Sequence, residues 1–193
     1  MSADSILMRL EALRAGRQGP FLLGVAGCDL GTTTTDVAST LAASAAKRQT
    51  GRVLLVRCHG GDDHPGPGLG ELLRGKATIS EVIRIADDEL DVLPAGNLQR
   101  ETLAPAAVLS TLQSVAAPYQ LVVLDLPAVS EEAPSLVFNP SVHGVALVID
   151  ARKTRIREAQ AAHRILQENQ VEVLGTILTR VRPTLPRFLD RWF

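Results

Sequence analysis

Residues 21–35 read FLLGVAGCDLGTTTT, and this stretch decides the fold. Phe21–Ala26 is a short, continuous apolar run of the kind that forms a buried β-strand. A loop with two glycines follows, and the threonines then open an alanine-rich helix that we expect over Thr33–Arg48. A strand, a glycine-containing loop and a helix N-terminus present backbone N–H groups to an anion. The sequence therefore predicts a phosphate-type site at this loop, and a plain strand-to-helix turn is the alternative.

The rest of the chain alternates short apolar runs with helix-like segments. The further runs that we predict as strands are Val53–Val56, Leu90–Pro94, Leu121–Leu124, Val145–Ile149 and Val173–Leu178. The segments that we predict as helices are Ile6–Arg14, Leu69–Arg74, Ile79–Ala86, Pro105–Ala116 and Ile156–Asn169. Nearly continuous apolar strands between helices indicate an α/β fold with a mostly parallel sheet and helices on both faces. Ligands of such sheets bind at the carboxyl ends of the strands.

Length and charge limit the domain count and the kinds of partner. The 193 residues, 46% of them hydrophobic, suit one domain with a single core, because domains span roughly 100–200 residues. Within it we expect a peripheral N-terminal helix in residues 1–18 and a C-terminal tail at residues 183–193. The formal net charge of −1 provides no global basic field for nucleic acid or an anionic membrane. We therefore expect no nucleic-acid partner, and recognition of any partner through a local patch.

The apolar runs and the cysteines predict a cytoplasmic protein. No run approaches the roughly 20 residues of a membrane-spanning helix, and residues 1–18 lack the continuous apolar run of a secretory signal. Cys28 and Cys58 form no disulfide pattern, as expected in a reducing compartment. Together with His59 and His64 they offer a zinc-like ligand set, but their spacing matches no zinc finger or ribbon. Two buried thiols and two loop histidines are the interpretation that we prefer.

Several segments, in order, resemble the bacterial tyrosine kinase domains of capsule and exopolysaccharide export. They are Gly68–Thr78, Val82–Ile83, Leu90–Gly96, Tyr119–Pro127 and Gly144–Thr154, and the likeness runs from about Phe21 to about Val181. These kinases belong to the MinD/ParA group of deviant Walker ATPases, so the resemblance implies one P-loop NTPase-like domain over residues 1–193. It implies ATP or ADP with Mg²⁺ as the ligand. It also implies a partner, the cytoplasmic end of a membrane polysaccharide co-polymerase or chain-length determinant at the inner face of the plasma membrane.

The resemblance places a vestigial nucleotide site at the carboxyl ends of four predicted strands. Its residues are Asp29, Leu30, Gly31, Thr32, Thr33, Thr34, Arg57, Asp125 and Thr179. The family loop ends Gly-Lys-Ser/Thr-Thr, which we align with Gly31–Thr34, so that Thr32 stands at the lysine and Thr33 at the magnesium-binding hydroxyl. A threonine supplies no cation, although phosphoryl transfer depends on positioning and charge stabilisation. Asp125 corresponds to the Walker B acid, and Thr33 and Asp125 are the remaining candidate ligands for Mg²⁺.

Other family features are also replaced. The acids that follow the second strand of the family correspond here to Arg57 and His59, although Mg²⁺ requires oxygen ligands. Thr179 replaces an asparagine that lies beside the adenine in the family. Because an isolated buried carboxylate is costly, we predict that Asp125 bonds to Arg57 or to a threonine hydroxyl. Arg57 lying outward over the surface is the alternative.

The two ends of the chain allow alternative interpretations. The kinases end in a cluster of phosphorylated tyrosines, whereas the one tyrosine here is Tyr119 and the tail has none. Glu11, Arg14 and Arg17 have the E-x-x-R-x-x-R spacing through which related kinases form rings; a solvated helix face is the alternative. The basic and aromatic tail suits docking on a partner or membrane, or packing on its own domain.

These features together predict a catalytically degenerate pseudo-kinase that acts as a regulator or adaptor in exopolysaccharide or capsule biosynthesis. One alternative is an active tyrosine kinase or ATPase that uses Thr33, Asp125 and a cation from Arg57 or from a partner chain. Another is a MinD/ParA-like positioning ATPase, which would dimerise when it binds nucleotide. A homo-oligomer and a partner kinase are further partners that the resemblance allows.

Overall fold

The computed structural model describes residues 3–14, 18–29, 32–48, 51–59, 66–98, 104–129 and 134–181. Its centre is a seven-stranded sheet in the order β3-β4-β2-β5-β1-β6-β7. The strands are β1 (Phe21–Gly27), β2 (Val53–Arg57), β3 (Arg84–Asp87), β4 (Leu90–Leu93), β5 (Leu121–Asp125), β6 (Gly144–Asp150) and β7 (Val173–Thr179). All neighbours are parallel except β3 and β4. The predicted α/β fold with a mostly parallel sheet is confirmed.

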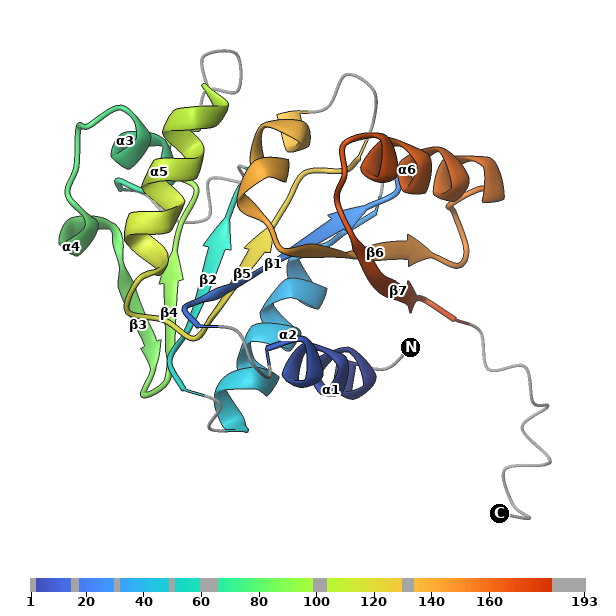
Figure 1. Cartoon of the computed structure of the whole chain (residues 1–193), viewed down its shortest axis with the longest axis horizontal. Coiled ribbons are helices and arrows are strands. Elements are labelled where there is room, and N and C mark those ends of the chain that lie inside the picture. Colours follow the sequence, from blue (N-terminus) through green and yellow to red (C-terminus); the bar gives the residue numbers. More distant parts are fainter. Residues whose placement is uncertain are drawn as a thin grey trace.

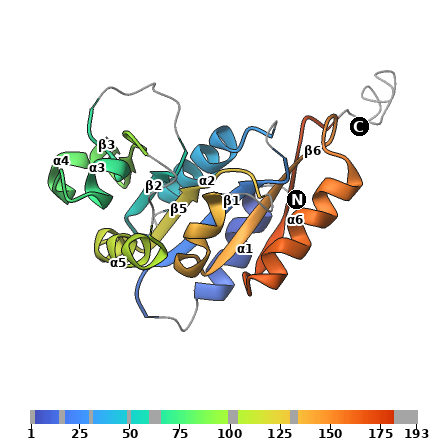
Figure 2. The same ribbon diagram turned by 90° about the horizontal axis from the view of Figure 1, so that it is seen from above.

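Helices cover both faces of this sheet, as Figures 1 and 2 show. One face carries α1 (Ala3–Arg14) and α2 (Thr35–Lys47). The other face carries α3 (Leu69–Leu73), α4 (Ile79–Val82), α5 (Pro105–Ala116), the 3₁₀ helix η2 (Pro134–Ser141) and α6 (Ile156–Glu168). Strand β1 lies between β5 and β6, and all seven of its residues are buried, as its apolar sequence predicted. The sheet therefore separates two apolar cores, one on each face.

Three expectations about individual elements were wrong. The segment Ile79–Ala86 is helical only in α4, because the chain then enters β3 and turns back into β4. As an exposed edge strand, β3 needs no apolar face, and its Ile85 is 82% exposed. Helix α2 begins at Thr35, not at Thr33. Helix α1 is not peripheral, since Ile6, Leu7 and Leu10 are buried in the core formed with α2, although Met8 is exposed.

No helix within the described ranges is long and apolar enough to span a membrane.

Candidate functional site

The carboxyl ends of β2 and β5 bring the first two site residues together. These strands are parallel neighbours, and Arg57 is paired in register with Asp125. Nη1 of Arg57 lies 3.5 Å from Oδ2 of Asp125, whose side chain is only 1% exposed. The predicted partner of Asp125 is thus confirmed. Arg57 points to the carboxylate instead of lying over the surface.

Two threonines from the start of α2 complete the partners of this carboxylate. Thr34 donates its hydroxyl to Oδ1 of Asp125 at 2.6 Å, and Thr35 donates to Oδ2 at 2.8 Å. The predicted hydroxyl partner is therefore also confirmed. Both carboxylate oxygens are engaged by hydroxyl groups of the chain itself.

His59, which we had placed at a replaced family acid and in a possible zinc set, also belongs to this site. Its Nε2 lies 3.1 Å from Oδ1 of Asp125 and 3.4 Å from the Thr34 hydroxyl. A signal for it was present in the sequence, because His59 stands where the family has its second acid beside the Walker B carboxylate. Thr34, Thr35, Arg57, His59 and Asp125 are called the Asp125 cluster below.

The Asp125 cluster holds an ionised carboxylate in a nearly dry position. Burial alone would raise the pKa of Asp125, but hydrogen bonds with His59, Thr34 and Thr35 and the charge of His59 lower this pKa below its ordinary value. Asp125 is therefore charged at neutral pH. Its charge is compensated by groups of the same chain.

The structure changes which threonines lie at this position. In P-loop sites the hydroxyl that follows the lysine holds Mg²⁺ together with the Walker B acid. Thr33, which the alignment assigned to that hydroxyl, is exposed. The hydroxyls at Asp125 belong instead to Thr34 and to Thr35, the first residue of α2. If Thr35 corresponds to the magnesium hydroxyl, the lysine position is occupied by Thr34 and not by Thr32.

Thr32 belongs to a separate set of hydrogen bonds. Its hydroxyl donates to Oδ2 of Asp29 at 2.9 Å, and Thr154 donates to the same oxygen at 2.6 Å. Thr154 also accepts the backbone N–H of Asp150 at 3.1 Å. These bonds tie the loop after β1 to the loop after β6. They give Thr32 and Asp29 a structural explanation that needs no nucleotide.

The Asp125 cluster does not fit a magnesium ion. Mg²⁺ prefers an octahedron of oxygen ligands, usually including several waters. Here each carboxylate oxygen already accepts a threonine hydroxyl, and the nearby side chains that replace the family acids are a guanidinium and an imidazole. Within the described part of the chain, no group of three or more His, Cys, Asp and Glu side chains could hold a metal.

The remaining predicted residues do not join the Asp125 cluster. Thr179, at the end of β7, donates its hydroxyl to the Ile149 carbonyl at 3.4 Å. Cys28 and Cys58 are both buried; burial raises the pKa of Cys28 to about 12 and the pKa of Cys58 well above its ordinary value. These thiols are protonated at neutral pH. Leu30, Gly31, His64, Arg17 and the tail lie outside the described residues.

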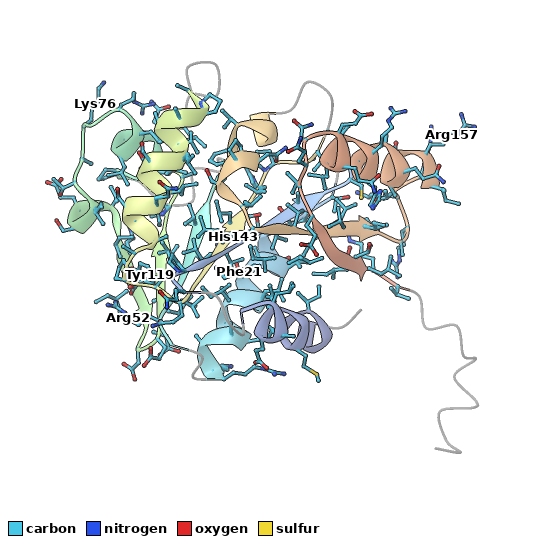
Figure 3. All side chains as sticks on the ribbon, in the orientation of Figure 1. Phe21, Arg52, Lys76, Tyr119, His143 and Arg157 are labelled. Carbon is cyan, nitrogen blue, oxygen red and sulfur yellow. The ribbon has the colours of Figure 1, made fainter. Side chains whose placement is uncertain are left out.

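Tyr119 is a core residue and not an exposed phosphate acceptor. It is 6% exposed, and its hydroxyl donates to Oδ2 of Asp91 at 2.7 Å. Arg52 donates to the same oxygen at 2.6 Å, and its guanidinium lies 5.5 Å from the centre of the tyrosine ring (Figure 3). Burial and the hydrogen bond to Asp91 raise the pKa of Tyr119.

In helix α1, Oε1 of Glu11 lies 3.6 Å from Nη1 of Arg48. One member of the proposed ring-forming motif is thus engaged within its own chain.

No family model matches the chain, and no curated protein sequence matches it significantly. Solved structures do match it, and they agree with this architecture. The kinase domain of VpsO is 23% identical, with a TM-score of 0.74 over 93% of this chain and 96% of that one. The kinase domain of Escherichia coli tyrosine kinase ETK is 21% identical, with a TM-score of 0.79 over 95% and 79%.

A chain of the MinC:MinD cell division protein complex of Aquifex aeolicus is 15% identical, with a TM-score of 0.72 over 89% of this chain and 72% of that one. The chain has the P-loop fold of MinD/ParA-like proteins. At these identities the likeness establishes the fold alone. The chemistry of this chain must be argued from its own residues.

Proposed function

We propose that this chain is a catalytically degenerate P-loop pseudo-kinase that acts as a regulator or adaptor in exopolysaccharide or capsule biosynthesis. One observation carries the proposal. The carboxylate that would organise magnesium, Asp125, is already bonded within the same chain, to the Arg57 guanidinium, the His59 imidazole and two threonine hydroxyls.

The chemistry of phosphoryl transfer explains why this arrangement opposes catalysis. The reaction needs cations on the transferred phosphate and a metal held by acids. Residues 27–35 contain no lysine or arginine, and the acids beside Asp125 are replaced by Arg57 and His59. Removing one group that stabilises transition-state charge commonly costs about 3 kcal/mol of barrier. Several such groups are missing here at once.

Protein contact is then the remaining role for this domain. The resemblance to capsule and exopolysaccharide kinases supports, as partner, the cytoplasmic end of a membrane polysaccharide co-polymerase or a partner kinase. The kinase domains of VpsO, BceF and ETK share this fold, which supports the kinase part of the resemblance. Deletion of the gene should change polysaccharide amount or chain length, and unchanged polysaccharide would contradict this role.

An active ATPase or kinase is the second candidate, and one contact favours it. The Arg57 side chain is 27% exposed and its contact with Asp125 is long, at 3.5 Å. A guanidinium held this loosely could turn to an anion at the loop after β1 and act as the missing cation. This candidate predicts ATP consumption that disappears in Asp125→Ala.

Calorimetric titration with ADP and ATP, with and without Mg²⁺, tests the degenerate site. The natural chain should bind neither nucleotide. The triple variant Thr34→Lys, Arg57→Asp, His59→Asp should gain magnesium-dependent binding, because it restores a cation and two acids around Asp125. A matched variant with Thr32→Lys in place of Thr34→Lys keeps the same net charge and should gain none. Tight magnesium-dependent binding to the natural chain would overturn the proposal.

A further inference from the structure

Exposed cations gather where β6 leads into α6. Arg152, Lys153, Arg155 and Arg157 lie within the loop and the first helical turn, and all four residues are exposed. Among the described residues, none of these four side chains forms an ion pair. These residues and Ile156 are called the β6–α6 basic patch below.

The acids near this patch are already engaged. Asp150 is 2% exposed, pairs with Arg180 at 3.1 Å and accepts the backbone N–H of Arg152. The carboxylate of Glu158 accepts the backbone N–H of Arg155 at 2.7 Å. Neither acid therefore neutralises the exposed cations through an ion pair.

The position of the cations is unfavourable for the helix itself. The N-terminus of a helix carries partial positive charge, so cations there reduce stability. Arg155 and Arg157 lie at this end of α6. Helix stability does not explain their presence, whereas an external anion would compensate their charge.

Ile156 indicates which kind of anionic partner fits. It is 78% exposed and stands between Arg155 and Arg157. Single-stranded nucleic acid would need aromatic side chains for base stacking, and the patch has none. Basic residues around an exposed apolar side chain are the combination that binds anionic bilayers, with the apolar group at the headgroup boundary.

We propose that the β6–α6 basic patch docks on membrane surfaces that contain anionic phospholipid, with Ile156 inserted at the headgroup level. The net charge of −1 makes such binding local, so the molecule has a defined orientation on the bilayer. Figure 3 shows Arg157 at the outer end of α6, on the side of the molecule opposite Lys76. This proposal does not depend on whether the phosphate-type site is degenerate.

Sedimentation of the full chain with vesicles tests the proposal. The natural chain should bind phosphatidylcholine vesicles that contain phosphatidylglycerol, bind pure phosphatidylcholine far less, and lose binding as salt rises. Lys153→Gln with Arg157→Gln should weaken binding roughly 25-fold, because each cation near an anionic surface contributes about fivefold. The matched variant Lys47→Gln with Lys76→Gln changes net charge equally, at exposed sites away from the patch, and should bind like the natural chain.

Two results would overturn the proposal. The first is equal vesicle binding by the patch variant and the natural chain, which would assign any membrane affinity to another part of the protein. The second is binding to polyglutamate without binding to anionic vesicles, which would assign the patch to an acidic protein partner. Ile156→Ser gives an independent measurement: it should weaken vesicle binding without changing its salt dependence.

Discussion

Two buried aspartates, near opposite ends of the sheet strands, are held in different ways. Asp91 of β4 accepts the Tyr119 hydroxyl and the Arg52 guanidinium on one oxygen, at 2.7 and 2.6 Å. Asp125 of β5 accepts a hydrogen bond from a threonine hydroxyl on each oxygen, at 2.6 and 2.8 Å, while the guanidinium of Arg57 lies farther away, at 3.5 Å. Both carboxylates are nearly inaccessible to water.

Under the proposed function, the difference separates a structural site, at Asp91, from a converted ligand site, at Asp125. At Asp91 the cation is in direct contact and the aromatic ring packs beneath it, which suits a role in stability alone. At Asp125 the strong bonds come from the loop and helix start that carry phosphate sites in this fold, and the cation is loosely placed. An ancestral ligand site in which protein groups replaced the ligand would have this geometry.

The largest expected effect is on stability when Asp125 is removed. Asp125→Ala leaves two hydroxyls, an imidazole and a partly buried guanidinium without their shared partner. Breaking a buried charged group of this kind should lower the free energy of unfolding by about 3 kcal/mol. Urea denaturation measures it. A loss below about 1 kcal/mol would mean that water easily replaces the Asp125 carboxylate and that the Asp125 cluster is accessible to solvent.

A smaller effect is expected at Asp91. Tyr119→Phe removes one hydrogen bond to a charged group and should cost about 1.5 kcal/mol in the same measurement. Arg52→Gln and the double variant complete a cycle, and non-additive losses are expected because both residues contact one oxygen. If Tyr119→Phe costs more than Asp125→Ala, the comparison between the two aspartates is reversed.

Acid titration tests how the charge of Asp125 is held. The pKa of Asp125 is lowered in the folded protein, so its contribution to stability is complete at neutral pH and is lost as pH falls below the ordinary carboxyl value of about 4. Stability should therefore fall more steeply at acid pH in the natural chain than in Asp125→Asn, which cannot titrate there. Parallel curves would show that the Asp125 charge is not stabilised by its neighbours.

The smallest effect concerns local opening. Cys58 lies between Arg57 and His59, is fully buried, and its pKa is raised by burial and by the charge of Asp125. Alkylation of this thiol at neutral pH should be very slow in the natural chain and faster in Asp125→Ala, because alkylation requires the cluster to open. Tyr119→Phe is the control and should leave the rate nearly unchanged. Rapid labelling of the natural chain would contradict a closed site.

Sequence reasoning recovered the sheet because its strands are short, continuous and apolar. It missed β3, whose exposed edge position imposes no apolar pattern on Arg84–Asp87. It also placed the start of α2 two residues early, because a run of threonines carries no periodicity that marks a helix start.

The contact between Arg57 and Asp125 could be predicted because a buried carboxylate needs a partner and both residues end strands of the predicted sheet. That these two strands are neighbours needed the structure. The choice of Thr34 and Thr35 over Thr33 could not be predicted, because it depends on how the loop backbone enters the helix. His59 was recognised as a replaced acid, yet its hydrogen bond to Asp125 needed the structure.

The strand order also determines when this edge of the molecule can form. Phe21 of β1 pairs with Leu121 of β5, and Leu23 of β1 pairs with Gly144 of β6. Both partner strands of β1 are therefore synthesised long after β1 itself. Contacts of such long sequence separation form slowly and late. We therefore expect the loop after β1 to acquire its hydrogen bonds to Asp125 only after β5 has emerged from the ribosome, in the same step that closes the centre of the sheet.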